Sequence, residues 1–196
     1  MSHSRPTKFA HVVYRTRRFE QMLRWYTTVF GAKVQYQSPG LAFLTYDNEH
    51  HRFAFANMAV LQPDGTDMKR RGAIGVDHVA YTYASLGDLL ENYARLEEEG
   101  ISPYWCVHHG ITASLYYADP DGNQMEFQVD CCKSIEEATA FIKTHWDANP
   151  VGVEFDPSEW LSRLRTGAPE SEFLLRRVHE PVSPIRGEIE GFVSAG

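Results

Sequence analysis

A strand-like segment that contains a single histidine occurs twice in this chain, and this repeat does most to limit the folds it can adopt. The first copy is "KFAHVVY", around His11, and the second is "GVDHVAY", around His78. Each copy is followed by a helical pattern that ends in glycine and then by three more strand-like segments. Self-similarity of this kind indicates two copies of one supersecondary unit.

The two helical segments show why each half begins in the same way. They are "RFEQMLRWYTTVFG", which ends at Gly31, and "SLGDLLENYARLEEEG", which ends at Gly100. In both segments apolar residues recur three and four positions apart, which is the pattern of a helix with one buried face. Ser85, with Asp88 three residues later, resembles a capping box, and glycine suits the residue that ends a helix.

The strand-like segments complete the predicted fold. They are "KVQYQ", "LAFLTYD" and "RFAFANM" in the first half, and "SPYWCV", "ASLYYADP" and "QMEFQVD" in the second. We therefore predict an α+β fold of two βαβββ modules, at about residues 7–60 and 75–130, within a single domain over residues 1–130. Their sheets are expected to curve together into a half-open mixed barrel.

The last third of the chain, residues 131–196, is predicted to be a C-terminal helical extension and tail. Its helical segments are "SIEEATAFIKTHW", "PSEWLSRLRTG" and, with a weaker pattern, "SEFLLRR". We expect this extension to pack against the domain or to join two copies in a homo-oligomer, a dimer. Trp146, Phe155 and Trp160 are interpreted as core anchors of this part.

Charge and hydropathy exclude several classes of partner. The net charge of −7 argues against nucleic acid, because duplex binding needs a clustered basic surface. No apolar run is long enough to span a bilayer, so we expect no membrane partner. The N-terminus lacks the apolar core of a secretory signal, and the three cysteines show no disulfide or zinc spacing. A cytoplasmic protein with reduced thiols is expected.

The paired modules bring possible metal ligands to one place. His11 and His78 occupy matching positions of the first strands and are predicted to face each other inside the barrel. A third ligand comes from "DPDGNQMEFQ", where a tight turn precedes an alternating strand that carries Glu126. A buried carboxylate is costly unless it is paired or bound to metal. From the residues alone, a solvent-facing Glu126 on an edge strand remains the alternative.

The segments "AHVVY", "VDHVAY" and "HHGITASLYYADPDGNQMEF" resemble the vicinal oxygen chelate superfamily. Within it, residues 7–130 are most similar to the extradiol catechol dioxygenases of the one-domain 2,3-dihydroxybiphenyl 1,2-dioxygenase type. The resemblance implies Fe(II), with Mn(II) as the alternative metal, in a site of two histidines and one carboxylate. By motif match the ligands are His11, His78 and Glu126.

The resemblance also implies four residues around the reacting groups. "NEHHRFAF" places His51 beside the O₂ position, where it would stabilise negative charge that develops during the reaction. Tyr116 would hydrogen-bond a substrate oxygen. The pattern "HGIT" favours His109 as the acid–base residue, and His108 remains the alternative. If the strand register shifted by one residue, Tyr117 would take the place of Tyr116.

One position separates the members of this superfamily. Aligning "LTYDNEHHRFAF" with "YYADPDGNQMEF" places Ala54 opposite Glu126, and alanine cannot ligate a metal. The resulting three-ligand site suits a non-haem Fe(II) enzyme, and the resemblance implies ring cleavage of a small aromatic diol by O₂ next to the diol. The alternatives are another metal-dependent enzyme of the superfamily (an isomerase, lyase or thiol transferase) and a non-catalytic protein that binds small molecules. The identity of the diol is not predicted.

Overall fold

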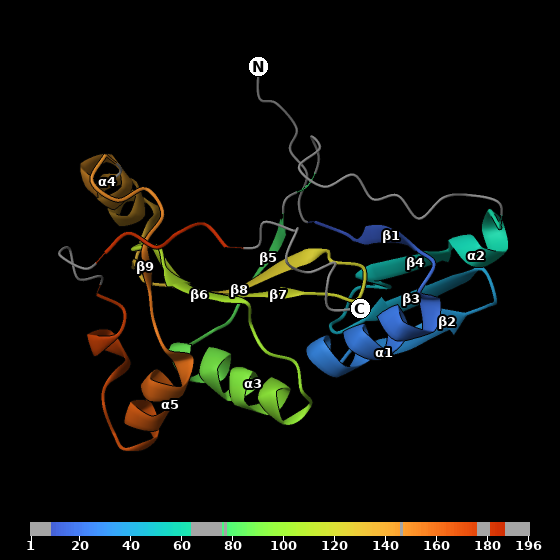
Figure 1. Ribbon diagram of the computed structural model, residues 1–196, viewed down its shortest axis with the longest axis horizontal. Helices are drawn as coiled ribbons and strands as arrows, with labels where there is room; N and C mark the ends of the chain where they lie inside the picture. Colours follow the sequence, from blue (N-terminus) through green and yellow to red (C-terminus); the bar gives the residue numbers. More distant parts are fainter. Residues whose placement is uncertain (1–8, 64–75, 77, 146, 176–180, 187–196) are drawn as a thin grey trace. The chain divides into compact units, whose positions relative to one another are not determined.

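The computed structural model describes residues 9–63, 76, 78–145, 147–175 and 181–186 (Figure 1). The contacts within the chain divide it into two compact units. The first unit comprises residues 1–70 together with the short turn 119–121. The second comprises residues 71–118 and 122–196. Each unit contains one of the two predicted modules, and the C-terminal segment belongs to the second.

The first unit has the predicted strand–helix–strand–strand–strand order. Its elements are β1 (Val12–Thr16), α1 (Phe19–Phe30), β2 (Lys33–Gln37), β3 (Leu41–Thr45), β4 (Phe53–Asn57) and the short α2 (Met58–Leu61). The sheet order is β1-β4-β3-β2. β1 runs parallel to β4, and the other pairs are antiparallel. The prediction of a mixed sheet is confirmed, whereas α2 was not predicted because its four residues carry no periodic signal.

Helix α1 forms the core of this unit with one face of the sheet. Its buried residues recur every three to four positions, as the sequence predicts: Phe19, Met22, Leu23, Trp25, Tyr26 and Val29. The helix ends at Gly31, whose φ of 59° is the left-handed conformation that glycine adopts without strain. The fully buried Tyr26 contacts Phe53 and Phe55. Its hydroxyl donates a hydrogen bond to Oδ2 of Asp119 at 3.1 Å.

The second unit repeats the same order. Its elements are β5 (His78–Thr82), α3 (Leu86–Glu98), β6 (Trp105–His108), β7 (Thr112–Ala118) and β8 (Gln124–Asp130). β5 is parallel to β8, and β7 lies antiparallel between β8 and β6. The predicted cap is present, because the Ser85 hydroxyl accepts a hydrogen bond from the Asp88 backbone N–H at 3.0 Å. The prediction of two βαβββ modules is therefore confirmed.

The C-terminal segment differs in part from the predicted helical extension. It forms α4 (Ile135–His145), β9 (Val153–Glu154), α5 (Pro157–Arg165) and the 3-10 turn η1 (Glu170–Glu172). The two main helices agree with the prediction. β9 was not predicted, yet it adds a fifth strand to the second sheet beside β6. The described part of "SEFLLRR", residues 171–175, contains the end of the 3-10 turn and no α-helix, so the prediction is wrong there. The rest of that segment and Trp146 lie outside the described residues.

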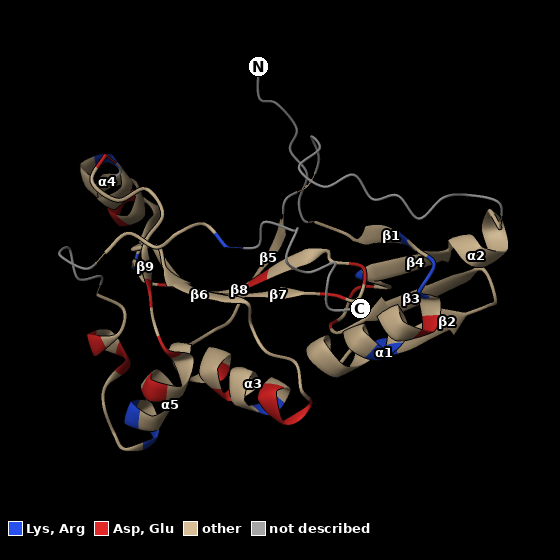
Figure 2. Cartoon of the chain, viewed as in Figure 1, with Lys and Arg blue, Asp and Glu red and all other residues tan. Residues whose placement is uncertain are grey.

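Charged residues of both signs are mixed along the helices of the second unit (Figure 2). The helices α3 and α5 contact each other, and Arg165 donates to both carboxylate oxygens of Glu91 at 2.9 and 2.7 Å. In the part of the chain that the structure describes, no helix is both long enough and apolar enough to cross a membrane.

The strand registers of the two sheets correspond residue by residue. In the first sheet Val13 of β1 pairs with Ala54 of β4. In the second, Ala80 of β5 pairs with Glu126 of β8. His11 and His78 each lie two residues before the paired position, so the registers agree with the alignment of Ala54 with Glu126. One detail of the sequence prediction is corrected: His11 directly precedes β1 and does not lie within it.

Candidate active site

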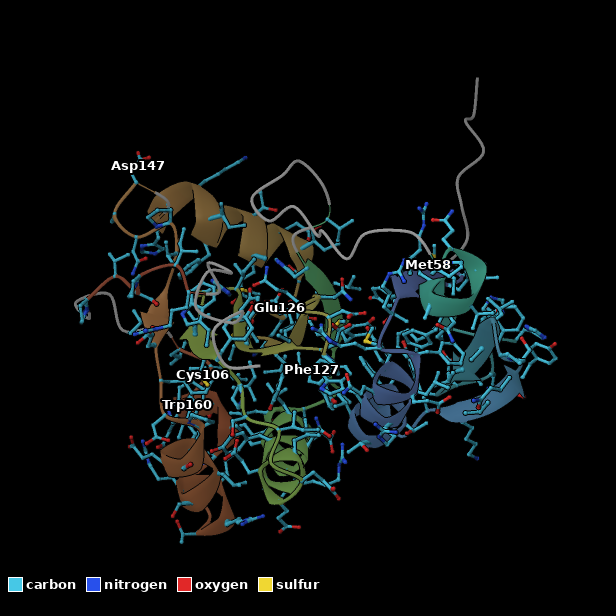
Figure 3. All side chains as sticks on the ribbon, turned by 45° about the vertical axis from the view of Figure 1, so that its right-hand side comes forward. Met58, Cys106, Glu126, Phe127, Asp147 and Trp160 are labelled. Atoms are coloured by element: carbon cyan, nitrogen blue, oxygen red, sulfur yellow. The ribbon has the colours of Figure 1, made fainter. Side chains whose placement is uncertain are left out.

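A histidine and a carboxylate meet on one face of the second sheet. Glu126, labelled in Figure 3, lies on β8. His78 begins the neighbouring parallel strand β5. The His78 Nε2 atom lies 3.1 Å from Oε2 of Glu126. The carboxylate is only 6% exposed, so the interpretation of Glu126 as a solvent-facing residue on an edge strand is wrong. β8 lies between β5 and β7, in the interior of the sheet.

The surroundings of Glu126 keep its carboxylate ionised. Burial raises its pKa, because the charged form is poorly solvated there. Hydrogen bonds from His78, Ser114 and Tyr116 oppose this effect and hold the pKa below the ordinary value of a glutamate. A buried, ionised carboxylate beside an imidazole nitrogen is a pair of donors that suits a divalent metal ion.

Tyr116 and His109 adjoin this pair. Tyr116 of β7 is the register partner of Glu126. Its hydroxyl lies 3.0 Å from Nε2 of His109, and its ring lies edge-on to the ring of His78 at 5.5 Å. Nε2 of His109 is also 3.9 Å from Oε1 of Glu126. The second unit therefore brings together four of the residues identified from sequence: His78, His109, Tyr116 and Glu126.

His108 points away from this group. It is the last residue of β6 and is only 4% exposed. Its Nδ1 accepts a hydrogen bond from the Gly110 backbone N–H at 3.0 Å. Because Nδ1 is the acceptor, a neutral ring carries its proton on Nε2, which lies 3.6 Å from the Cys131 sulfur. Of the two adjacent histidines, the structure places His109 next to Tyr116 and gives His108 partners elsewhere.

Tyr117 also lies outside the group. Its side chain is 1% exposed and contacts Phe127 at a ring distance of 5.3 Å. The described residues provide no hydrogen-bond partner for its hydroxyl. Alternation along β7 places Tyr116 and Tyr117 on opposite faces of the sheet, as the sequence predicts.

The remaining candidates form a histidine cluster in the first unit. The rings of His11 and His51 are 4.3 Å apart, and the Nδ1 atoms of His50 and His51 are 2.8 Å apart. Phe43 covers His51 at a ring distance of 4.6 Å. Burial lowers the pKa of His51, and the neighbouring His11 and His50 lower it further. His51 is thus held in its neutral form at neutral pH.

Ala54 occupies the position in the first sheet that corresponds to Glu126. It is buried between Val13 and Phe43, its partners on the adjacent strands. This position therefore contributes no donor atom. Within the described ranges, no three His, Cys, Asp or Glu side chains gather as a metal site. His78 and Glu126 meet in the second unit, whereas His11 belongs to the first.

Three residues around the site were not identified from the sequence. The Ser114 side chain hydrogen-bonds Glu126. Trp105 stacks on Tyr116 at a ring distance of 4.9 Å, and the Val151 backbone carbonyl hydrogen-bonds Nδ1 of His109. Strand alternation offered a signal for Ser114, which is two residues before Tyr116. The contact of the Val151 backbone carbonyl has no sequence signal, because every residue has such a carbonyl.

Comparisons with known proteins show which family the chain belongs to. A model of the glyoxalase/bleomycin resistance protein/dioxygenase superfamily matches residues 8–127. Biphenyl-2,3-diol 1,2-dioxygenase 2 of Rhodococcus globerulus is 47% identical over 163 residues, which cover 83% of this chain and 84% of that protein. Biphenyl-2,3-diol 1,2-dioxygenase 3 of the same organism is 38% identical over 86% of this chain and 88% of its own length.

Solved structures give the same fold at low sequence identity. A glyoxylase/bleomycin resistance protein/dioxygenase domain from Frankia sp. EAN1pec aligns with a TM-score of 0.55 and 18% identity, over 69% of this chain and 99% of that one. Lactoylglutathione lyase from Agrobacterium tumefaciens aligns with a TM-score of 0.51 and 18% identity, over 64% of this chain and 96% of its own. The predicted resemblance is confirmed, and the chain belongs to the glyoxalase/bleomycin resistance protein/dioxygenase superfamily.

Proposed function

We propose that this chain is an extradiol dioxygenase, which opens the ring of a small aromatic vicinal diol with O₂ next to its hydroxyl-bearing carbons. The observation that carries the proposal is the group of ionised Glu126, His78, Tyr116 and His109 on one sheet face. The two biphenyl-2,3-diol 1,2-dioxygenases, at 47% and 38% identity, support it. They also favour a biphenyl-2,3-diol-like substrate.

The residues present fit a metal of the Fe(II) type, with Mn(II) as the alternative. Imidazole nitrogen and carboxylate oxygen form the donor set of non-haem Fe(II) sites, and the ionised Glu126 faces Nε2 of His78. His11 is the proposed third ligand, because the register of its sheet gives it the position that His78 has in the other sheet. The alanine at position 54 adds no fourth ligand, which leaves positions for the diol and O₂.

Bound Fe(II) would hold the two diol oxygens and O₂ at one point and allow electron density to pass between them. The chain's own residues would handle protons and charge. Tyr116 is within hydrogen-bond distance of Nε2 of His109, so a proton from a substrate hydroxyl can reach the imidazole through the phenol. A histidine is suited to this task because its ordinary pKa is near neutrality.

His51 is the proposed residue on the oxygen side. Its ring is covered by Phe43 and held neutral by burial and by its two histidine neighbours. A neutral imidazole can donate one hydrogen bond to negative charge that develops on oxygen, without adding a full positive charge in the ground state. Donors placed in advance for such a charge lower the barrier of the step in which it forms.

Anaerobic reconstitution tests this function. The full chain is loaded with Fe(II) without oxygen, mixed with a panel that includes biphenyl-2,3-diol and simple catechols, and then exposed to air. O₂ uptake together with a yellow ring-opened product is expected. Protein shown to hold one metal per chain that consumes no O₂ with any diol would reject the proposal. It would then favour another reaction of the superfamily or ligand binding without turnover.

A further inference from the structure

We propose that Asn149 is a positioning residue, which fixes the tautomer of His109 through the turn from residue 149 to residue 152 in the C-terminal segment. This inference rests on the proposed function for the role of His109. The contacts that support it lie within the second unit and do not depend on the metal. Through these contacts the C-terminal segment hydrogen-bonds a residue of the candidate site, His109.

The first step is the hydrogen bond of the His109 ring. Its Nδ1 atom faces the Val151 backbone carbonyl oxygen. A carbonyl oxygen can only accept, so Nδ1 must carry the proton. In a neutral ring Nε2 then has a lone pair, and it faces the Tyr116 hydroxyl at 3.0 Å. The Val151 carbonyl thereby selects the tautomer whose Nε2 carries a lone pair, which can take a proton from Tyr116 when that hydroxyl turns from Glu126 to the imidazole.

The second step is the construction of the turn that presents this carbonyl. Oδ1 of Asn149 accepts from the backbone N–H groups of Val151 at 3.1 Å and Gly152 at 2.7 Å. Its Nδ2 donates to the Gly152 carbonyl at 3.0 Å. One side chain therefore holds three backbone groups of the turn. Asparagine is suited to this arrangement because its amide supplies both an acceptor and a donor.

The turn is also fixed against the strand that leads to His109. Gly152 has a φ of 129°, and a Cβ atom there would lie 2.5 Å from the His108 carbonyl oxygen. Directly after it, Val153 of β9 pairs with His108 of β6. Glycine permits this close approach. The turn is therefore fixed in position next to His108, the residue before His109.

A later part of the segment supports the same group. The Ser183 N–H donates to the Gly152 carbonyl at 2.9 Å. The Ser183 hydroxyl accepts from Nε1 of Trp105 at 2.9 Å. Trp105 in turn stacks on Tyr116 and meets the ring of His109 edge-on. Both partners of the Tyr116–His109 hydrogen bond are therefore braced by C-terminal residues.

Nitrogen NMR of the histidine rings in the metal-free full chain tests the proposal. The His109 signals are assigned by their loss in His109→Gln. Wild-type protein is expected to show one tautomer, with the proton on Nδ1. Asn149→Ala should give averaged signals from both tautomers. Asn149→Asp keeps the Oδ1 acceptor but replaces the Nδ2 donor with a carboxylate oxygen facing the Gly152 carbonyl, so it should change the pattern less than Asn149→Ala does.

Asn57→Ala is the matched control. It removes an asparagine at the end of β4 that also bonds backbone groups, those of Pro39 and Ala59, but in the first unit. This variant should leave the His109 signals unchanged. In turnover with a diol, Asn149→Ala should lower kcat by about 10-fold or more with little change in KM, because groups that orient a functional histidine have effects of this size.

Each outcome decides the proposal. A wild-type His109 with its proton on Nε2 overturns the proposal. This measurement needs no variant, so it tests the proposal even if Asn149→Ala does not fold. An unchanged His109 pattern in folded Asn149→Ala overturns it as well. If the tautomer shifts as expected but the wild-type protein turns over no diol, the positioning role stands and only the proposed function fails.

Discussion

Nε2 of His78 lies 3.1 Å from Oε2 of Glu126, across two parallel strands of one sheet. A buried carboxylate would ordinarily destabilise the fold, because removing the charge from water is costly. Here hydrogen bonds to the ionised form exceed the effect of burial, so the pKa of Glu126 is lowered. The sheet therefore holds a charged carboxylate oxygen in place, as the proposed metal site requires.

Glu126→Gln should abolish metal binding while the fold is kept. Glutamine has nearly the same shape but no charge, so it can still accept hydrogen bonds while it loses its attraction for a cation. We expect metal affinity to fall by more than about 100-fold, beyond the effect typical of groups that only orient ligands. Titration calorimetry with Fe(II) or Mn(II) measures it.

The control for this variant is Glu159→Gln, at a carboxylate on α5 that is largely exposed. It should bind metal as the wild type does. Equal metal affinity in Glu126→Gln and the wild type would remove Glu126 from the ligand set.

Tyr116→Phe and Tyr117→Phe should have opposite consequences. The first removes the hydroxyl next to His109 and should lower kcat by about 100-fold, the lower range for a residue that transfers protons. The second removes a buried hydroxyl with no partner among the described residues. Because an unsatisfied buried hydroxyl costs roughly 1–3 kcal/mol, Tyr117→Phe should keep activity and hold or increase the free energy of unfolding.

Steady-state kinetics and urea unfolding distinguish the two tyrosine variants. If Tyr117→Phe lost turnover and Tyr116→Phe did not, the register of β7 would differ by one residue from the one in the structure. That result would exchange the assigned roles of the two tyrosines.

The sequence was sufficient for the two modules because they follow from periodicity: a period of three to four residues located α1 and α3. Glu126 and Tyr116 were identified by the family resemblance, and the strand register shows that they share one face. Periodic signals need several residues to develop. β9, with only Val153 and Glu154, is too short to carry one, so its addition to the second sheet could not be predicted.

Other features depend on tertiary contacts that have no sequence pattern. Alternation shows that His108 and His109 point in opposite directions, but not which of them faces Tyr116. That choice follows from the pairing of β6 with β7, in which His108 opposes Ala113. The contact of His109 with the Val151 carbonyl requires the C-terminal segment to fold back onto the sheet, 42 residues later in the chain.

His108→Phe and His109→Phe test the assignment of the two adjacent histidines. His108→Phe keeps a ring in a buried site but leaves the Gly110 N–H without its acceptor. It should lower the free energy of unfolding by about 1–3 kcal/mol, and the folded fraction should keep most of its turnover. His109→Phe should fold and should lose about 100-fold or more in kcat. Reversed results would make His108 the acid–base residue.

His51→Ala should retain metal and lose turnover, whereas His50→Ala should retain both. His51 is partly covered by Phe43 and held neutral, which suits a hydrogen-bond donor to oxygen. His50 is exposed, and its ring bonds His51 and lies 6.2 Å from that of Phe43. We expect His51→Ala to lose about 100-fold in kcat, within the range for one lost donor at a developing charge. Because the ligand set is unchanged, metal affinity should stay within the experimental error.

Metal content, O₂ uptake and product absorbance are measured on the same preparations. Full turnover in His51→Ala would reject His51 as the oxygen-side residue, and loss of metal would instead indicate that it helps to hold His11.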